Sequence, residues 1–401
     1  MRNFNEEFIL AHANDDVRQL ALKAHGIKGI DLPFVLDQIA GRQTAKRKLP
    51  SWAAVSGVIY PPHLSMEQCS SERTAQYKAE IISLHTPYSL LLTDLTGGFG
   101  VDFSFMSRSF KHAVYVERQE KLCDIAKENF RLLGLDNAEV VCGDGEEYLR
   151  QMDKADVIYL DPARRDSNGA KTFAISDCTP DVVTLLPLLL QKATVVMVKL
   201  SPMLDWRKAI ADIGEEYVRE VHIVSVNNEC KELLLLITSQ QTIPPALFCV
   251  NFTGDKVSTL KSPLITPQCP RVANVSLSSS PLYLYEPNAS IMKAACFDIL
   301  LAKYENLEKI APNSHLFTSD TLVTDFPGRT FSIKASTSLN KKELRRALSG
   351  ITSANITTRN FPLSVADLRK RLKLKDGGDT YIFATTDSND AHILYICAKL
   401  S

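Results

Sequence analysis

The stretch that decides the fold is Leu90–Asp102, which reads LLLTDLTGGFGVD. An apolar run ends at Asp94, and glycines follow at positions 97, 98 and 100. Glycine permits tight turns and close approach of the backbone to a ligand, because it has no Cβ atom. In open α/β sheets, ligands bind at the carboxyl ends of the strands. The stretch therefore predicts a buried strand, a tight turn and a helix, with a ligand at the turn; a glycine-rich turn without a ligand is the alternative.

The same alternation of short apolar runs and amphipathic segments extends over residues 87–240. Unbroken apolar runs are typical of strands covered on both faces, and strands that alternate with helices indicate a parallel sheet. We therefore predict an α/β fold with a Rossmann-like, seven-stranded, mostly parallel sheet. The predicted strands are 89–94, 113–116, 138–142, 157–160, 194–199, 220–226 and 233–238, and the predicted helices are 102–108, 119–133, 146–152, 181–191 and 204–213.

The pattern of the chain predicts four regions. Residues 1–86 form an N-terminal helical region in which Gly41 ends a helix, and 87–240 form the α/β core. Residues 241–325 begin as a Pro- and Ser-rich linker with a short β excursion, followed by a strand and one helix over 289–304, capped by Asn288 or Ser290. Residues 326–401 are predicted as a small α+β region in the order β-α-β-α-β-β, with its helices on one face of a sheet.

Composition limits the class of protein. The chain has 401 residues, with 46 Lys and Arg against 46 Asp and Glu, so no global charge draws it to nucleic acid or to a membrane. Nine scattered cysteines without a C-x-x-C pair favour reduced thiols and no metal site. The start, MRNFNEEFILAHANDD, lacks the features of a signal peptide, and no apolar run approaches the ~20 residues of a membrane span. We expect a cytoplasmic protein that neither associates with a membrane nor binds a metal ion.

Three further acidic residues follow predicted strands, as Asp94 does. Glu117 ends the second strand and can accept hydrogen bonds from both hydroxyls of a ribose. Asp144 follows the third strand and can bind an adenine amino group, and Asp161 ends the fourth. A lone acid at such a place is more often a helix cap or a solvated loop residue. Four in succession indicate a nucleotide-type site.

Two nucleotide cofactors are candidates for this site. A dinucleotide site requires G-x-G-x-x-G, whereas Phe103 occupies the third glycine position here. Asp102 also places negative charge where a pyrophosphate would bind. S-adenosylmethionine carries positive ammonium and sulfonium groups, which suit Asp94 and the glycine carbonyls. The charges therefore favour S-adenosylmethionine over NAD.

With these motifs, residues 87–240 resemble a class I S-adenosylmethionine-dependent methyltransferase, whose first motif, D-x-x-x-G-x-G, is matched by Asp94, Gly98 and Gly100. The stretch DLTGGFGVD resembles ribosomal-RNA guanine methyltransferases. The whole chain resembles a bacterial methyltransferase family with a ferredoxin-like segment and a THUMP-like C-terminal domain, through EQCSSERTAQYKA, LDPARRD, VKLSP and EPNASIMKA. The resemblance implies S-adenosylmethionine as cofactor. The predicted contacts to it are Asp94, Thr96, Gly98, Gly100, Glu117, Arg118, Asp144 and Gly145.

The fourth predicted strand indicates the reaction. Enzymes that methylate exocyclic amines of bases carry Asp or Asn before Pro-Pro and an aromatic residue; Asp161 and Pro162 match this pattern, and Ala163 and Arg164 depart from it. Arg164 could stack on a base or pair with an acid. Lys199 could contact substrate or pair with Asp161. Methylation at C5 of a pyrimidine would need a cysteine nucleophile, and neither DPARR nor KLSP contains a cysteine. We therefore predict transfer to nitrogen, with Asp161 and Pro162 orienting the acceptor.

Basic residues gather near the C-terminus. Residues 341–376 hold ten Lys and Arg and three acids, a local charge of +7 on a neutral chain, and Arg42–Lys48 is a second basic run. Such collections indicate a phosphate-binding surface, although solvated helix faces explain single runs. We predict structured RNA (rRNA or tRNA) as substrate, with Arg345, Arg346, Arg369 and Arg371 among its contacts. A small-molecule methyltransferase and a non-catalytic RNA-binding protein remain the alternatives.

Overall fold

The computed structural model describes residues 4–23, 27, 29–87, 90–164, 175–239, 245–263 and 281–400, with the backbone alone at Arg164. The chain divides into two compact units. The first consists of Met1–Arg219 and Leu234–Ile243, and the second of Glu220–Leu233 and Pro244–Ser401.

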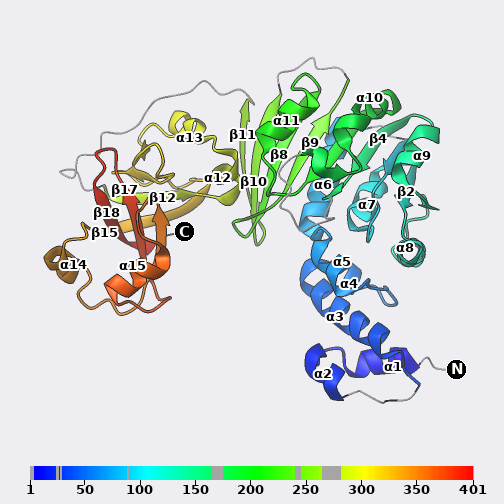
Figure 1. The fold of residues 1–401 in the computed structure, drawn as a ribbon, viewed down its shortest axis with the longest axis horizontal. Helices are drawn as coiled ribbons and strands as arrows, with labels where there is room; N and C mark the ends of the chain where they lie inside the picture. Colours follow the sequence, from blue (N-terminus) through cyan, green and yellow to red (C-terminus); the bar gives the residue numbers. More distant parts are fainter. Residues whose placement is uncertain are drawn as a thin grey trace. The chain divides into compact units, whose positions relative to one another are not determined.

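The N-terminal region is helical, in agreement with the spacing of its apolar residues (Figure 1). The prediction that Gly41 ends a helix is wrong, because α3 continues through it to Lys48. A Cβ atom at Gly41 would lie 2.3 Å from the Cβ atom of Tyr60, so the glycine makes room for the tyrosine instead. The helices are α1 (Phe4–Ala11), α2 (Val17–Lys23), α3 (Leu32–Lys48), α4 (Pro50–Ala53), α5 (His63–Gln68) and α6 (Glu72–His85).

All seven predicted strands of the core are present in a sheet of nine strands, in the order β11-β10-β8-β9-β7-β4-β1-β2-β3. Five neighbouring strands, β7, β4, β1, β2 and β3, pair in parallel, which confirms the α/β prediction. The two further strands form from residues that sequence assigned to a linker with a short β excursion. The strands are β1 (Leu91–Asp94), β2 (His112–Glu117), β3 (Ala138–Cys142), β4 (Ala155–Leu160), β7 (Ala193–Leu200), β8 (Val218–Val226), β9 (Glu229–Ile237), β10 (Ala246–Thr253) and β11 (Lys256–Pro263).

Helices connect the parallel strands where the amphipathic segments predicted them. Asp144, Asp181 and Asp205 cap α9, α10 and α11 by accepting hydrogen bonds from backbone N–H groups of the first turn. The short strands β5 (Ala163–Arg164) and β6 (Cys178–Thr179) pair with each other. The helices are α7 (Val101–Met106), α8 (Glu120–Leu132), α9 (Gly145–Gln151), α10 (Val182–Lys192) and α11 (Trp206–Ile213), with 3₁₀ turns at Ser107–Ser109 and Ile175–Asp177.

The second unit contains a seven-stranded sheet in the order β13-β14-β12-β15-β18-β17-β16. From β15 onward its elements follow the predicted order β-α-β-α-β-β. The single helix expected over 289–304 is wrong: Ala295 adopts a left-handed backbone (φ 54°) and separates two short helices. Asn288 is the N-cap, and its side chain accepts a hydrogen bond from the N–H of Ile291. The elements are β12 (Tyr283–Pro287), α12 (Ala289–Ala294), α13 (Phe297–Lys303), β13 (Glu308–Lys309), β14 (Phe317–Ser319), β15 (Gly328–Thr337), α14 (Lys341–Ala347), β16 (Asn355–Arg359), α15 (Val365–Leu372), β17 (Thr380–Thr386) and β18 (His392–Lys399).

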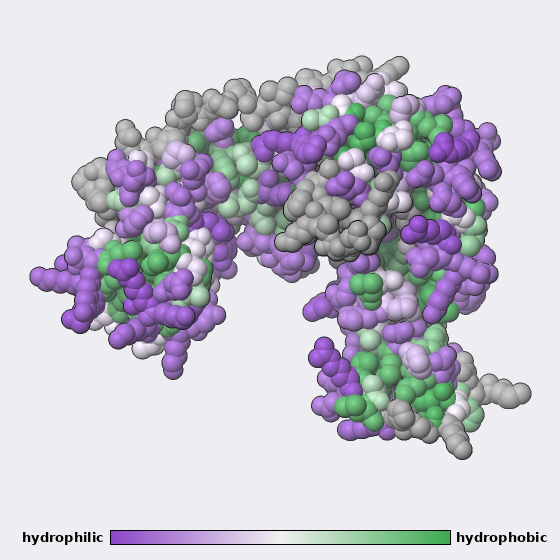
Figure 2. Space-filling model, viewed as in Figure 1, coloured by the Kyte–Doolittle hydropathy of each residue, from purple (hydrophilic) through white to green (hydrophobic). Residues whose placement is uncertain are grey.

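Helices α14 and α15 pack against the same apolar cluster of this sheet. Leu344 of α14 and Leu368 of α15 both belong to the cluster built on Ile382, Leu394 and Ile396. The guanidinium of an arginine in α15 also reaches the loop that precedes α14. The two helices are therefore neighbours on one face of the sheet, as predicted, and Figure 2 shows mainly hydrophilic residues where Figure 1 places α14.

Candidate active site

The turn after β1 is tied to the end of β4 through Thr96. The backbone N–H of Thr96 donates to Oδ1 of Asp94 (2.9 Å), and the Thr96 hydroxyl accepts from the backbone N–H of Asp161 (2.6 Å). Asp94 is only 1% exposed, and burial raises the pKa of its carboxyl group to about 8, although the Thr96 hydrogen bonds oppose this rise. A cation placed beside Asp94 would stabilise the ionised carboxylate.

Glu117 links the glycine turn to the end of β2. Its Oε2 accepts from the N–H of Gly98 and its Oε1 from the N–H of Gln119, both at 2.9 Å. The side chain is therefore held with both oxygens at the carboxyl edge of the sheet. A carboxylate has about four acceptor positions, so these contacts leave capacity for the hydroxyls of a ribose.

The glycines of the turn are required by the aromatic side chains packed beneath them. A Cβ atom at Gly97 would lie 2.2 Å from the ring of Tyr115, and one at Gly100 would lie 2.7 Å from the ring of Phe130. Gly98 and Gly100 also have left-handed φ angles of 56° and 81°. The Tyr115 hydroxyl donates a hydrogen bond to the Gly98 carbonyl. The Gly98 carbonyl therefore already accepts one hydrogen bond within the protein, and its oxygen can accept a second.

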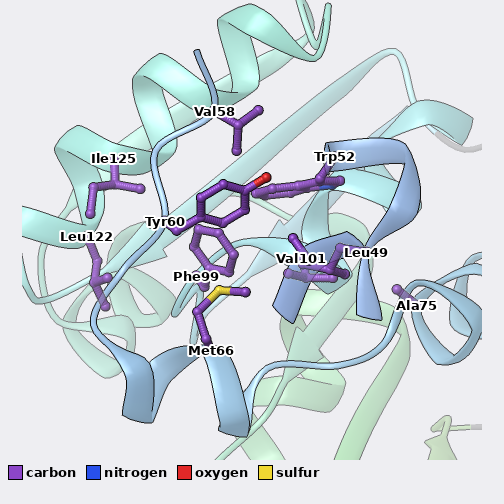
Figure 3. Packing of buried hydrophobic residues seen from close by; sticks show 11 residues of the cluster. Leu49, Trp52, Val58, Tyr60, Met66, Ala75, Phe99, Val101, Leu122 and Ile125 are labelled. Atoms are coloured by element: carbon purple, nitrogen blue, oxygen red, sulfur yellow. The ribbon is translucent and has the colours of Figure 1, made fainter. Parts of the chain in front are cut away.

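Phe99, between Gly98 and Gly100, anchors the turn in the N-terminal helical region. Its ring meets that of Trp52 edge-on with centroids 4.9 Å apart, and Tyr60 lies 6.4 Å away. Figure 3 shows this ring among side chains of the N-terminal helices and of α8. The shared apolar cluster also contains Leu49, Val58, Met66, Ala75, Val101, Leu122 and Ile125. The N-terminal helices thus support the position of the glycine turn.

The predicted adenine-binding residue, Asp144, caps α9. Its Oδ1 accepts hydrogen bonds from the N–H groups of Glu146 (2.9 Å) and Glu147 (3.1 Å). These two bonds fix the orientation of the carboxylate. A Cβ atom at Gly145 would lie 2.2 Å from the carbonyl oxygen of Leu95, so this glycine brings the start of α9 against the loop after β1. Arg118, beside Glu117, is exposed.

Asp161 and Lys199 form the other end of the site. The side chain of Asp161 is 39% exposed, whereas that of Lys199 is 12% exposed, and Lys199 Nζ donates a hydrogen bond to Asp161 Oδ2. Pro162 is buried next to Asp161. The backbone of Arg164 pairs with Cys178 in the β5–β6 ribbon, while its side chain, Arg165 and Asp166 lie outside the described residues.

Behind this pair lies a buried charged cluster that the sequence did not indicate. Asp102 Oδ1 lies 3.1 Å from Nζ of Lys78, which is fully buried, and Asp102 Oδ2 lies 3.6 Å from Nζ of Lys199. The Ser70 and Tyr159 hydroxyls each donate to Asp102 Oδ2 at 2.8 Å. Burial alone would raise the pKa of Asp102, but the two lysines and the two hydroxyls hold it below its ordinary value.

This cluster corrects the charge argument made for Asp102. From sequence, this carboxylate is predicted to repel a phosphate at the start of α7; in the structure it is buried and compensated by Lys78 and Lys199. Phe103, which replaces the third glycine of a dinucleotide motif, is fully buried and packs against Tyr115 and Phe130. The remaining preference for a cationic cofactor therefore depends on Asp94. Lys78 belongs to EQCSSERTAQYKA, one of the stretches that carry the family resemblance. Nothing in the sequence indicates its buried contact with Asp102.

The predicted RNA contacts differ in their surroundings. Arg345 and Arg346 are exposed on α14, and Arg371 is exposed on α15 with one hydrogen bond to the carbonyl of Leu339. Arg369 has a structural role instead: its guanidinium donates to the carbonyls of Ala354 and Lys375 and to Asp376. This arginine closes the loop after α15, so its guanidinium is less available to substrate than sequence suggested.

Comparison with known proteins identifies the family. Three family models match: "Conserved hypothetical protein 95" over residues 80–205, a "ferredoxin-like domain" over 283–327 and a "THUMP domain-like" model over 328–399. A crystal structure described as a "putative methyltransferase from Porphyromonas gingivalis W83" is 30% identical, covers 100% of this chain and 98% of its own, and superposes with a TM-score of 0.83. The chain belongs to the class I S-adenosylmethionine-dependent methyltransferases with a THUMP-like domain.

Two curated relatives match part of this methyltransferase. Both are named protein-L-isoaspartate O-methyltransferase: that of Thermotoga maritima is 37% identical over 70 residues, and that of Nitrobacter winogradskyi is 29% identical over 118 residues. The matches cover 17% and 29% of this chain, and only 22% and 53% of the relatives. Their named activity is therefore not carried over to this methyltransferase.

The donor set of the glycine turn fits S-adenosylmethionine. The buried Asp94 carboxyl is suited to a cation, and the two ordered oxygens of Glu117 are suited to hydroxyl donors. In the part of the chain that the structure describes, no group of three or more His, Cys, Asp or Glu side chains could hold a metal ion. Within the same residues, no helix has the length and apolarity needed to cross a bilayer.

Proposed function

We propose that this methyltransferase transfers a methyl group from S-adenosylmethionine to a base nitrogen of structured RNA, of the rRNA or tRNA class. The observation that carries the proposal is the half-exposed Asp161 carboxylate at the end of β4, on the same sheet edge as Asp94 and Glu117. An acceptor nitrogen bound at Asp161 would lie beside a cofactor bound at Asp94 and Glu117.

The cofactor side of the pocket is proposed to bind by charge and by hydrogen bonds. Asp94 would neutralise the ammonium group, Glu117 would accept from the ribose hydroxyls, and Asp144 would accept from the adenine amino group. Thr96, Gly98, Gly100, Arg118 and Gly145 would shape the walls of the site. S-adenosylmethionine, when bound, supplies an electrophilic methyl group.

The acceptor side is proposed to work by placement. Asp161 Oδ2 is engaged by Lys199, so Oδ1 is the oxygen that would accept an N–H of the base. The Pro162 carbonyl would accept a second N–H. Methyl transfer to nitrogen depends mainly on in-line positioning of the nucleophile, and well-placed reactants can account for ~7–11 kcal/mol of the barrier.

The THUMP-like region supports RNA as the substrate class. Six exposed basic residues lie on the neighbouring helices α14 and α15 (Lys341, Lys342, Arg345, Arg346, Lys370 and Arg371). Glu343, an acid on α14, accepts hydrogen bonds from the hydroxyl and the backbone N–H of Ser338. We call these six residues the basic surface. Cations collected on two neighbouring helices of a chain with no net charge suit the phosphates of RNA.

The proposal is tested by transfer of labelled methyl from S-adenosylmethionine to total RNA from a strain that lacks the protein. We expect the wild type to label RNA, Asp161→Ala to lose labelling while still binding cofactor, and Glu117→Ala to lose cofactor binding in calorimetry. Labelling of small molecules or protein in place of RNA would contradict the substrate class. RNA affinity that does not change with salt concentration would argue for a small-molecule enzyme.

A further inference from the structure

Four charged side chains alternate in sign from the N-terminal helix α6 to the proposed acceptor pocket. Lys78 contacts Asp102, Asp102 faces Lys199, and Lys199 donates to Asp161. Their side-chain exposures rise along this sequence, from 0% and 10% to 12% and finally 39%. The row therefore begins inside the protein and ends where a substrate can reach it.

Each inner charge depends on its neighbours. A charge removed from water is costly unless it is paired and hydrogen-bonded. Lys78 also donates to the Ser70 hydroxyl (3.1 Å), which in turn donates to Asp102. Tyr159 donates to Asp102 from β4, the strand that ends at Asp161. Asp102 is thus held in place by groups from α6, from the segment before it and from β4.

Lys199 contacts both Asp102 and Asp161. Lys199 Nζ stands between two carboxylates, with the Asp161 oxygen nearer than the Asp102 oxygen at 3.6 Å. Because Lys78 already neutralises Asp102, Lys199 is available to Asp161. Without Lys78, the attraction of Asp102 would draw Lys199 away from the pocket.

We propose that Lys199 is a positioning residue of the acceptor pocket: it holds the Asp161 carboxylate by Oδ2, so that Oδ1 faces the acceptor nitrogen. Lys78 acts one step further back, by neutralising Asp102. This inference rests on the proposed methyl transfer at Asp161. It assigns part of the pocket's geometry to the N-terminal helical region.

The arrangement also accounts for the proton released in the reaction. The bond between nitrogen and the methyl carbon forms as the bond between that carbon and sulfur breaks, and the methylated nitrogen then holds one proton too many. Asp161 Oδ1 accepts this proton and passes it to water. Lys199 keeps its own proton throughout and holds Oδ2.

The test compares Lys199→Arg, which keeps the charge, with Lys199→Met, which removes it, using Lys208→Met as a matched surface control. Lys208 pairs with Asp212 on α11. We expect Lys199→Met to lower kcat about 100-fold, the effect of a misplacement of ~1 Å, with unchanged cofactor affinity in calorimetry. Lys199→Arg should recover at least a tenth of the wild-type kcat, and Lys208→Met should match the wild type.

A second variant tests the step behind Lys199, and cofactor affinity in calorimetry shows that each variant is folded. Lys78→Met does not touch Asp161, and we expect it to lower kcat while cofactor affinity stays at the wild-type level, at temperatures below its melting point. An unchanged kcat in folded Lys199→Met, or equal losses in Lys199→Met and Lys199→Arg, overturns the inference. A wild type that labels a different acceptor contradicts the proposed substrate alone, and the same variants are then compared on that acceptor.

Discussion

Substitution of Lys78 should measure how much the buried charged cluster contributes to the free energy of unfolding of the first unit. Lys78 is completely buried and lies 3.1 Å from Asp102, whose side chain is 10% exposed. Lys78→Met keeps an unbranched side chain of similar size and removes the charge, together with the hydrogen bonds that Nζ donates to the Ser70 hydroxyl and the Thr74 carbonyl. The expected effect therefore combines the lost ion pair with these lost hydrogen bonds.

The magnitude follows from what remains around Asp102. Loss of one partner of a buried ion pair typically costs ~3–5 kcal/mol, because the other charge stays buried. Here Lys199 and the Ser70 and Tyr159 hydroxyls still contact Asp102. We therefore expect a value near the lower limit, about 3 kcal/mol. The matched double variant Lys78→Met with Asp102→Asn removes both charges and should restore most of the lost stability.

Tryptophan fluorescence can measure this effect. The chain has two tryptophans, Trp52 and Trp206, and both are buried in the first unit. The change in their fluorescence with denaturant concentration therefore reports the unfolding of that unit. A cost below about 0.5 kcal/mol for Lys78→Met, the range of ordinary surface substitutions, would refute the reasoning. A double variant no more stable than the single one would refute it as well.

The pH dependence of the same transition gives an independent check. The pKa of Asp102 is depressed in the folded protein, so its ionisation stabilises the fold above the ordinary carboxyl pKa of ~4. That contribution is lost as the pH falls below this value. We expect the loss on acidification to be smaller in Lys78→Met than in the wild type.

Other substitutions test the proposed cofactor and RNA sites. Phe99→Ala should destabilise the first unit by ~3–5 kcal/mol in the fluorescence assay, because it removes a buried ring; a loss below 1 kcal/mol would contradict its anchoring role. Gly100→Ala should abolish cofactor binding in calorimetry, because its Cβ atom would overlap an aromatic ring at a left-handed φ; wild-type affinity would show that the turn can adjust. Since the pKa of Asp94 is raised to about 8, the cofactor affinity should fall as the pH drops from 8 to 6, by at most about tenfold per unit, and Asp94→Asn should remove this dependence. Replacement of Arg345 and Arg346 by alanine should lower the slope of log K for RNA binding against log[salt] by the equivalent of about one to two phosphate contacts. An unchanged slope would place the RNA elsewhere.

Local pattern predicted most of the elements, because each is determined by residues close in sequence. The apolar runs located the seven core strands, and Asn288 capped its helix as expected. Failures occurred where a distant residue decided the outcome. The sequence predicts a helix end at Gly41, whereas the close approach of Tyr60 is what requires a glycine there.

The sequence by itself determined the order of strands and helices, the glycine turn and the set of acids at the strand ends. These properties depend on periodicity and on backbone freedom, which are local. Only the tertiary structure decided that Asp102 is a neutralised interior charge, that Tyr115 engages the Gly98 carbonyl, and that Lys78 lies behind Lys199 and Asp161. Burial and charge pairing join residues far apart in the chain, and such contacts leave no local pattern to read.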